Sequence, residues 1–497
     1  MRPFTATFTA PRHKQERHAV TIERNSFYID GQWVPPSTSA RFQVTNASTE
    51  EVIGVAPEGA PADIDRAVAA ARRAFEDSEW SRYTPAERGA AINRFADAIE
   101  KRCPDIARTV SLQNGMPISV SQQLEAGYTV AVLRYYAALA TSLQTEESRP
   151  SPLGSTTLVR KEPIGVVGAI VPWNFPVILS MMKIGPALAT GCTMVLKPSP
   201  GTPLDSFLIA EAAHEAKLPP GVLNWVPGER DLGAYLVSHP GINKVAFTGS
   251  TGAGRAIAAV CGQLLRPVSL ELGGKSAGIV LEDADLNAVA AGLLSASMLN
   301  NGQACFSCTR ILAPAKRYDE VVEAIASAVK GFKVGDALDP TTMVGPMASA
   351  AHRSRVLGYI EKGKTEAKLV AGGGDSGQSR GFFVAPTVFA DVDNDAVIAR
   401  EEIFGPVLSI IRYTDDNDAI RIANASEFGL GGSVWSVDRE RAIGLARRMA
   451  TGSVGINGYL PDLNAPFGGV KSSGLGREMG PESLSGYQTY KSVYQMG

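Results

Sequence analysis

Cysteine, histidine and net charge are all scarce in this chain of 497 residues. There are five cysteines and five histidines, and 48 basic against 50 acidic residues give a formal net charge of 48 − 50 = −2. So few cysteines, odd in number, argue against a disulfide framework and favour a reducing, cytoplasmic setting. Near-zero charge argues against nucleic acid, whose binding needs a basic surface that displaces counterions. The histidines show no metal-ligand spacing, so we expect no metal site.

The sequence also lacks a segment suited to crossing a membrane. Its longest uncharged stretch, residues 164–182, contains Pro172, Asn174 and Pro176, and a bilayer would leave backbone groups there unpaired. Residues 1–26 include no apolar run of signal-peptide length, and we interpret them as a flexible extension, with a targeting address as the alternative. We therefore expect neither a membrane nor a nucleic acid as partner.

Glycine is the one residue in clear excess, with 50 where average usage of about 7% predicts roughly 35. From Ile164 onward, helical segments alternate with the short apolar runs IGVVGAIV, TMVLK, GVLNWV, KVAFT and VSLEL. Strands that are apolar on both faces indicate a parallel sheet covered on both sides, the doubly wound α/β class that often binds nucleotides. A second such series after Leu272 predicts a second α/β domain.

Two local signals precede this region. Asp30-Gly31 within FYIDGQWV predicts a hairpin turn. Thr84-Pro85-Ala86-Glu87 predicts the start of a helix, because it supplies an N-cap, a proline at the first position and a glutamate three residues after the cap.

Two segments at strand ends suit a nucleotide. The glycine-rich turn FTGSTGAG, residues 247–254, follows the strand KVAFT and opens a helix, whose amino end favours a phosphate. The common GxGxxG fingerprint is absent, so a plain tight turn is the alternative. Lys197 in KPSP is placed for ribose hydroxyls or a phosphate, or else is a solvated lysine in a turn.

The segment NNGQAC ends on Cys305, a candidate nucleophile. The reactive form is the thiolate, so the residue needs partial exposure and a lowered pKa, which a loop of small and amide residues can supply. An inert core cysteine is the alternative. Cys305 and Cys308 also form CxxC; zinc would need a second ligand pair, a thioredoxin-like pair is another alternative, and a reversible disulfide between them as an oxidative off-state is a hypothesis.

Two further polar residues stand in apolar surroundings. Glu271 ends a strand against Gly273-Gly274, where a half-buried carboxylate would have a raised pKa that suits a general base. An exposed strand-end glutamate is the alternative. Asn174 in PWNFP either donates to a developing oxyanion or only stabilises a turn.

Seven motifs occur in one order: VPWNFP, VLKPS, FTGSTGAG, LELGGKS, NNGQAC, EEIFGP (401–406) and PFGGVKSSGLGRE (466–478). Over about residues 27–497 they make the chain resemble the aldehyde dehydrogenase superfamily of NAD(P)-dependent enzymes, which oxidise aldehydes to carboxylic acids. The resemblance implies NAD as cofactor, with NADP possible, a small-molecule aldehyde as substrate, and a homodimer or homotetramer.

The resemblance also implies a role for each matching residue. Cys305 becomes the nucleophile, Glu271 the base that activates water, and Asn174 an oxyanion donor beside the Cys305 N–H. Lys183 matches a lysine thought to assist proton transfer. The implied cofactor contacts are Ile170, Pro172, Trp173, Lys197, Ser199, Gly249, Ser250, Gly254, Glu402 and Phe404. The expected lining of an apolar substrate funnel is Phe175, Leu179, Met182, Ala304, Phe306, Tyr459 and Phe467.

The implied fold is aldehyde dehydrogenase-like α/β, with a Rossmann-like NAD(P)-binding domain, an α/β catalytic domain and a small oligomerisation β-arm. The expected boundaries are 27–140 with 162–272 for the first, 273–473 for the second, and 141–161 with 474–497 for the arm. The β-prone tail YQTYKSVYQM fits that arm.

One position departs from the family. Many members have glutamate two residues after the proline of KPxE, and Pro200 stands there, which leaves NADP open although no arginine is nearby. Three other functions remain alternatives. A CoA-acylating semialdehyde dehydrogenase would not need Glu271. A cysteine esterase or hydrolase would need a histidine partner, and no motif holds one. A non-catalytic protein on the same fold would not need every reactive position intact.

Overall fold

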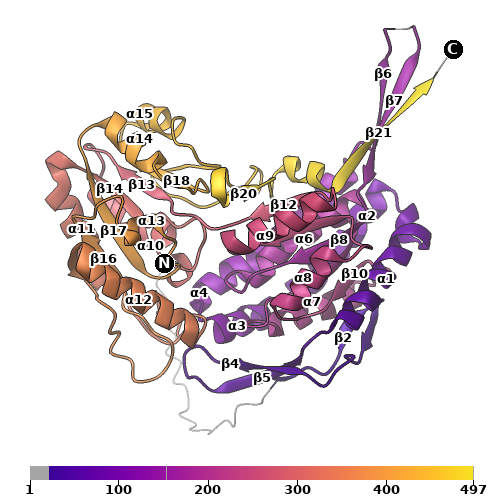
Figure 1. Cartoon of the computed structure of the whole chain (residues 1–497), viewed down its shortest axis with the longest axis horizontal. Helices are drawn as coiled ribbons and strands as arrows, with labels where there is room; N and C mark the ends of the chain where they lie inside the picture. Colours follow the sequence, from indigo (N-terminus) through magenta and orange to yellow (C-terminus); the bar gives the residue numbers. More distant parts are fainter. Residues whose placement is uncertain (1–21, 153, 496–497) are drawn as a thin grey trace, which may run out of the picture.

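The computed structural model describes residues 22–152 and 154–495, which form two α/β lobes and a projecting arm (Figure 1). The first lobe is built on an eight-stranded sheet in the order β20-β12-β11-β8-β9-β10-β2-β3. Its strands are β2 (Phe27–Ile29), β3 (Gln32–Val34), β8 (Val166–Ile170), β9 (Thr193–Lys197), β10 (Leu223–Trp225), β11 (Lys244–Thr248), β12 (Val268–Glu271) and β20 (Gly474–Leu475).

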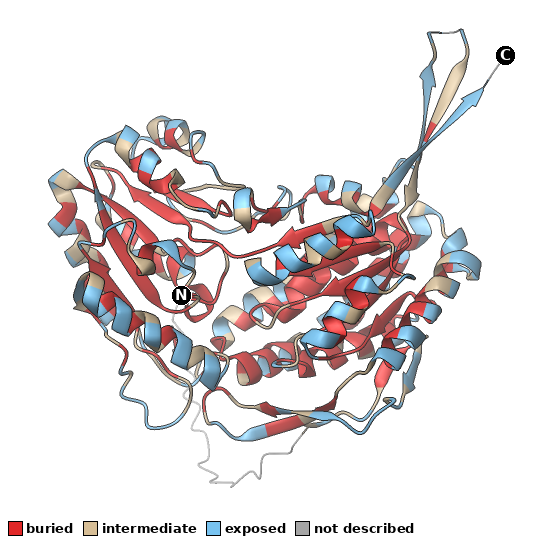
Figure 2. Ribbon diagram, in the orientation of Figure 1, coloured by how far each residue is buried: buried red, intermediate tan, exposed pale blue. Residues whose placement is uncertain are grey.

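Strands β8 to β12 are the five apolar runs, and they pair in parallel as predicted. All residues of β8, β9 and β11 are buried between helices (Figure 2), which is why these strands are apolar on both faces. From β8 the chain proceeds to β9 and β10 on one side and then to β11 and β12 on the other. The order therefore reverses between β8 and β11, the place where open α/β sheets bind ligands.

The second lobe is built on a seven-stranded sheet in the order β15-β16-β17-β14-β13-β18-β19. Its strands are β13 (Ala277–Val280), β14 (Arg310–Pro314), β15 (Lys368–Ala371), β16 (Thr387–Ala390), β17 (Val407–Tyr413), β18 (Gly432–Trp435) and β19 (Gly455–Ile456). All pairs are parallel except β15 with β16. The second α/β series of the sequence therefore forms its own sheet, as expected.

Helices cover the faces of both sheets (Figure 2). The first half of the chain contributes α1 (Pro61–Asp77), α2 (Pro85–Glu100), α3 (Cys103–Asn114), α4 (Ile118–Ser121), α5 (Thr129–Thr141), α6 (Pro176–Thr190), α7 (Leu204–Glu215), α8 (Arg230–Ser238) and α9 (Thr251–Gln263). The second half contributes α10 (Leu286–Ser297), α11 (Tyr318–Lys330), α12 (Ala350–Glu366), α13 (Val397–Arg400), α14 (Asp416–Asn424) and α15 (Arg439–Ala446). No helix in the described ranges combines the length and the apolarity needed to traverse a bilayer.

Short helical segments join several of these helices. A π-helical segment, η2 (Gln122–Tyr128), links α4 to α5. The 3₁₀ segments are η1 (Trp80–Arg82), η3 (Leu299–Gly302), η4 (Ala315–Arg317), η5 (Lys471–Ser473) and η6 (Pro481–Tyr487).

Both local predictions are confirmed. Asp30 and Gly31 have φ of 55° and 73°, as a tight hairpin between β2 and β3 requires. At the start of α2 the Thr84 hydroxyl accepts from the Glu87 N–H, and the Glu87 carboxylate accepts from the Thr84 N–H at 2.7 Å. Local chemistry alone therefore sets these two boundaries.

Two small sheets complete the fold. The first contains β1 (Ile22–Glu23), β5 (Val52–Pro57) and β4 (Arg41–Thr45). The second is the antiparallel arm of β21 (Gln488–Gln495), β7 (Thr156–Pro163) and β6 (Glu146–Pro150), which projects from the body with largely exposed strands (Figures 1 and 2).

Two strands differ from the expected organisation. Residues 22–23 were expected in a flexible extension, but they pair with β5; the rest of that extension, residues 1–21, lies outside the described residues. Strand β20 lies in the segment assigned to the arm, yet it pairs with β12 in the first sheet. The domain boundaries themselves stay a prediction.

Candidate active site

The site lies beyond the carboxyl ends of the first sheet, where that sheet faces the second lobe. Asn174 follows β8, Gly249 follows β11 and Glu271 ends β12. The second lobe contributes Cys305, which follows η3, and the segment 402–404. Two cavities meet here, and Asn174 and Cys305 line both of them.

The first cavity measures about 270 Å³ and has a mixed lining; we call it the polar cavity because Thr248, Ser250, Glu271, His352, Arg355 and Glu402 line it. Six predicted cofactor contacts line it: Pro172, Trp173, Gly249, Ser250, Glu402 and Phe404. The sequence analysis missed Thr248, Leu272, Gly273, His352 and Arg355, which also line it. Two of these hold the segment 402–404 in place: His352 Nε2 lies 2.7 Å from the Phe404 carbonyl oxygen, and Arg355 donates to the Glu402 carbonyl at 2.6 Å. Both lie on α12, and no motif marks that helix.

The other four predicted cofactor contacts do not line this cavity. Lys197 is 5% exposed and donates to the Gly228 and Pro198 carbonyls, and its burial lowers its pKa to about 8. The alternative of a solvated lysine is therefore wrong. Ile170 packs with Lys197 against Gly233 of α8. A Cβ at Gly254 would lie 2.5 Å from Leu272, so this glycine serves helix–sheet packing.

The fourth of them, Ser199, makes only a local turn contact: its hydroxyl accepts from the Gly201 N–H at 3.3 Å.

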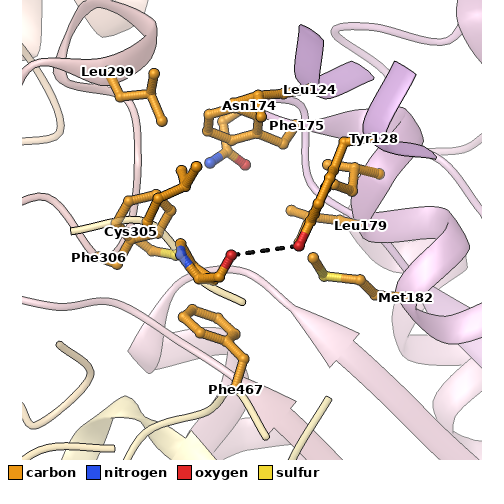
Figure 3. A pocket seen from close by; sticks show the side chains of 13 residues that line it. Leu124, Tyr128, Asn174, Phe175, Leu179, Met182, Leu299, Cys305, Phe306 and Phe467 are labelled. Atoms are coloured by element: carbon orange, nitrogen blue, oxygen red, sulfur yellow. Dashed lines mark hydrogen bonds between the residues drawn. The ribbon is translucent and has the colours of Figure 1, made fainter. Parts of the chain in front are cut away.

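The second cavity is an apolar funnel of about 60 Å³ (Figure 3). Five predicted residues line it: Phe175, Leu179, Met182, Phe306 and Phe467. The sequence analysis missed Leu124, Tyr128, Ile178, Leu299, Leu460 and Pro461. Leu124 and Tyr128 come from η2, a segment that the sequence analysis did not connect with the site, and Ile178 comes from α6, which also carries the predicted Leu179 and Met182.

Two predicted funnel residues lie outside it. Tyr459 packs edge-on behind Phe306 with ring centroids 5.3 Å apart, and its hydroxyl lies 2.7 Å from the Ser453 hydroxyl. Ala304 is 4% exposed, because the loop turns its short side chain into the core.

The backbone before Cys305 is unusual and firmly held. Asn300 and Asn301 have φ of 49° and 63°, a left-handed conformation that asparagine tolerates better than most residues. The Asn301 amide donates to the Gly115 carbonyl at 2.9 Å. The Asn300 amide donates to the Asn174 carbonyl at 2.8 Å, so this loop of the second lobe is tied to the Asn174 segment of the first.

Cys305 is partly exposed and forms no disulfide, but its electrostatics differ from expectation. Burial raises the pKa of the Cys305 thiol far above its usual value, and the negative charges of Glu402 and Glu271 raise it further. The sequence analysis expected a lowered pKa from polar neighbours in the loop. That expectation is wrong for this structure, because the thiol is desolvated by burial and two carboxylates from other segments act on it as well.

Glu271 is 3% exposed, so the alternative of an exposed strand-end glutamate is excluded. Neither of its carboxylate oxygens has a hydrogen-bond partner among the described residues. Burial raises the pKa of Glu271 well above its usual value, Glu478 adds to this, and Lys183 opposes it. An unpartnered carboxyl that lines the polar cavity can bind a water molecule and take its proton.

The Asn174 side chain lies at the edge of the funnel (Figure 3) and also lines the polar cavity. One hydrogen of its amide goes to the Gln303 carbonyl at 2.9 Å, which leaves the other for a ligand. Its own backbone carbonyl accepts from the amides of Asn300 and Asn114, at 2.8 and 3.1 Å. Asn114, at the end of α3, was also missed by the sequence analysis.

Lys183 lies below the site and does not line either cavity. It is fully buried, and its ammonium donates to Glu478 and to the Thr248 hydroxyl at 2.6 Å each. Thr248 lines the polar cavity, and the charges of Lys183 and Glu478 both act on Glu271. This buried ion pair is thus placed to influence the protonation of Glu271.

Comparison with known proteins shows which family the chain belongs to. The aldehyde dehydrogenase family matches residues 33–493. A geranial dehydrogenase from Castellaniella defragrans is 64% identical, covering 96% of this chain and 100% of that protein. A Mycobacterium tuberculosis aldehyde dehydrogenase complexed with NAD⁺ superposes with a TM-score of 0.94 at 44% identity, over 96% of this chain and 99% of that one. A Pseudomonas syringae aldehyde dehydrogenase complexed with NAD⁺ and octanal superposes with a TM-score of 0.91 at 39% identity, over 97% of this chain and 98% of that one. The chain therefore belongs to the aldehyde dehydrogenase family.

Proposed function

We propose that this protein oxidises apolar aldehydes to carboxylic acids with NAD, through a covalent intermediate on Cys305 that water hydrolyses. As a member of its family it is an NAD-dependent aldehyde dehydrogenase. The observation that carries the detailed proposal is that Cys305 and Asn174 line both cavities. One sulfur thus faces an apolar funnel that suits a substrate and a polar cavity that suits a cofactor.

The residues of the polar cavity fit a nicotinamide dinucleotide. Gly249 and Ser250 stand at the amino end of α9, which favours a diphosphate. The Glu402 carboxylate accepts from the Gly274 N–H at 3.0 Å and can also accept from ribose hydroxyls. Phe404 and Trp173 meet edge-on at 5.4 Å and offer an apolar wall to a ring. When bound, the cofactor accepts the hydride that leaves the aldehyde carbon.

The chain's own residues perform the other steps. The Cys305 thiol first loses its proton to solvent water. The thiolate then attacks the aldehyde carbon, a C–S bond forms, and the oxygen becomes an oxyanion that the Asn174 amide and the Cys305 N–H stabilise. Loss of the hydride from this thiohemiacetal leaves a thioester. Glu271 then takes a proton from water, the resulting hydroxide attacks the thioester, and the C–S bond breaks to release the acid. Lys183 and Glu478 tune the charge around Glu271.

The funnel favours an aldehyde with an apolar chain. Apart from the Cys305 thiol, the Asn174 amide and the Tyr128 hydroxyl, its lining is aliphatic and aromatic, and none of the described residues that line it is charged. One relative is named for geranial and one solved relative holds octanal, both apolar aldehydes. An unpartnered Glu271 favours hydrolysis over transfer to CoA. A cysteine hydrolase is disfavoured, because His352, although it lines the polar cavity, already contacts the Phe404 carbonyl through Nε2.

The value of kcat/KM is expected to rise with the length of the aldehyde chain. Each methylene buried in the funnel contributes about 0.8 kcal/mol, so kcat/KM should increase roughly fourfold per methylene until the funnel is full. The measurement is the absorbance of reduced nicotinamide with a homologous series of aldehydes. Running the series with NAD and with NADP also tests the consequence of Pro200.

Semialdehydes that carry a carboxylate serve as the matched control, and they should react far more slowly than neutral aldehydes of equal length. A preference for the charged series would contradict the proposed substrate class. Faster formation of reduced nicotinamide on addition of CoA would favour the acylating alternative.

The reactivity of Cys305 without cofactor is expected to keep rising with pH. A raised pKa means that the thiol form persists over neutral pH, so the alkylation rate should increase tenfold per pH unit beyond about 8.5, the ordinary value for cysteine. Mass spectrometry of the Cys305 peptide after iodoacetamide treatment measures this rate. Glu402→Gln should accelerate it above about pH 7, because burial raises the pKa of Glu402 to about 7 and the change removes a negative charge only where Glu402 is ionised.

Glu427→Gln is the control for that experiment, since Glu427 is an exposed carboxylate paired with Arg255 on the surface. It should leave the profile unchanged. A plateau of the parental rate below pH 8 would show that the pKa of Cys305 is not raised.

We further propose that the enzyme is a cytoplasmic homodimer or homotetramer that assembles through the arm. Strands β21 and β6 are the open edges of that sheet, and Tyr490 and Tyr494 are exposed on β21. Unpaired edges with exposed aromatic side chains favour pairing with another chain. All five cysteines are free thiols, which suits a reducing compartment.

A further inference from the structure

Helix α6 begins two residues after Asn174 and is buried along its whole length. The first N–H groups of a helix lack partners within it, and here they cannot reach water. The N-cap residue, Phe175, has no side-chain acceptor. Pro176 has no N–H, and the Leu179 N–H binds the Phe175 carbonyl at 3.1 Å. The Val177 and Ile178 N–H groups therefore need an acceptor from elsewhere in the fold.

Glu125 supplies this acceptor. The Val177 N–H donates to Glu125 Oε2 at 2.7 Å, and the Ile178 N–H also acts on the same carboxyl. The Glu125 side chain is fully buried, and its Oε1 has no hydrogen-bond partner within the described ranges. Burying a carboxyl costs free energy, and here the hydrogen bonds to the start of α6 must offset that cost. Glu125 is thus a cap for α6 supplied by a distant segment.

The same segment also touches the substrate funnel. Glu125 lies on η2, and Leu124 and Tyr128 of η2 line the funnel. The Tyr128 hydroxyl donates to the Pro461 carbonyl at 3.4 Å across its rim (Figure 3). Single π-helical turns within longer helices occur frequently at functional sites. One irregular turn therefore contacts the substrate cavity on one side and the start of α6 on the other.

We propose that Glu125 is a positioning residue, which fixes the start of α6 and thereby holds the Asn174 amide beside Cys305. The proposal rests on the oxyanion role of Asn174 given above. Asn174 is already held from the other lobe by its contacts with Asn300 and Gln303. Without Glu125, the start of α6 would shift to find other acceptors, and Asn174 would shift with it. A displacement of about 1 Å at such a donor can cost on the order of 10² in rate.

Glu125→Ala is expected to lower kcat between about tenfold and 100-fold. The KM for the aldehyde and the dissociation constant of NAD should stay within about threefold of the parent, since no substrate or cofactor contact is removed. Glu125→Gln, which keeps an acceptor for α6, should restore kcat to within about threefold. Steady-state kinetics, NAD titration by Trp fluorescence and thermal unfolding measure these quantities on the full-length enzyme.

Asp63→Asn is the matched control, because Asp63 is also a fully buried carboxyl at a helix start, where it accepts from the Ala60 and Ser37 N–H groups beside α1. It should change thermal stability with little effect on kcat. A folded Glu125→Ala enzyme with more than half of the parental kcat overturns the proposal, and so does a Glu125→Gln enzyme as impaired as Glu125→Ala. If Glu125→Ala does not fold, Glu125→Asp takes its place. Its shorter side chain withdraws the carboxyl from α6, so the same selective loss of kcat is expected, and an unchanged kcat overturns the proposal.

The double variant Glu125→Ala/Asn174→Ala separates positioning from an unrelated structural role. Asn174→Ala alone should cost roughly 10²–10³ in kcat. If Glu125 acts through Asn174, the kcat of the double variant should equal that of Asn174→Ala. A kcat lowered by the product of the two single losses overturns the proposal. A nearly active Asn174→Ala enzyme would instead overturn the oxyanion assignment, and a crippled Asn174→Ala beside a fully active Glu125→Ala would overturn only the role of Glu125.

Discussion

Replacing Cys305 with alanine is expected to abolish aldehyde oxidation while NAD still binds. The sulfur is the one group that lines both cavities and can form a bond to the aldehyde carbon. Without it, no thiohemiacetal forms and the hydride has no activated carbon to leave from. The cofactor contacts in the polar cavity stay intact, so the affinity for NAD should change little. Nicotinamide absorbance with saturating aldehyde, and quenching of Trp fluorescence by NAD, measure the two effects separately.

Cys308→Ala is the matched control for that variant. Cys308 lies three residues further on but is 1% exposed and lines neither cavity, so its replacement should leave kcat near the parental value. A Cys305→Ala enzyme that keeps a tenth of the parental activity would falsify the assignment of the nucleophile. The Cys308→Ala variant also tests the oxidative off-state. If a Cys305–Cys308 disulfide causes it, mild oxidant should inactivate the parent reversibly and should not inactivate Cys308→Ala in this way.

Replacing Glu271 with glutamine is expected to separate the two halves of the reaction. Glutamine has nearly the same shape but cannot accept the proton from water, so the thioester on Cys305 should form and then persist. The first turnover should yield a burst of one reduced nicotinamide per site, followed by steady-state turnover lowered by roughly 10²–10⁴. Rapid mixing measures the burst, and the mass of the intact protein should increase by the acyl group.

Chemical rescue provides the control for the Glu271 variant. Hydroxylamine attacks a thioester without needing a base, so it should restore part of the turnover of Glu271→Gln and hardly affect the parent. Steady-state turnover within tenfold of the parent would show that another group activates the water. Complete loss of both the burst and the turnover would show that Glu271 acts before the hydride leaves, for example by deprotonating the Cys305 thiol.

Much of the site could be predicted because its residues follow strands that the sequence itself reveals. Parallel strands end at the same edge of a sheet, so Trp173 after β8 and Gly249 after β11 had to lie near each other. Lys197 also follows a parallel strand, yet its ammonium turns toward the Gly228 carbonyl. Strand position thus predicts where a residue lies, but neighbours from other elements decide which way its side chain points.

Other residues could not have been found in this way. His352 and Arg355 lie on α12, far in sequence from the segment 402–404 that they hold. Leu124 and Tyr128 enter the funnel from η2, whose π-helical geometry has no signature in local propensity. These contacts come from packing between elements distant in the chain, which periodicity and turn chemistry do not encode.

The sequence by itself determined the α/β class and the order of the parallel strands along the chain, because apolar periodicity, capping and turn chemistry are local. Its motifs, through the family resemblance, pointed to the side chains that we propose as reactive. Only the tertiary structure decided the electrostatic surroundings and the hydrogen-bond partners of those side chains. It brings Glu402 and Glu271 near Cys305, leaves Glu271 without a partner among the described residues, and pairs Lys183 with Glu478. The physical reason is that a pKa depends on burial and on charges a few ångströms away, and those charges come from other segments of the chain, up to 295 residues apart for Lys183 and Glu478.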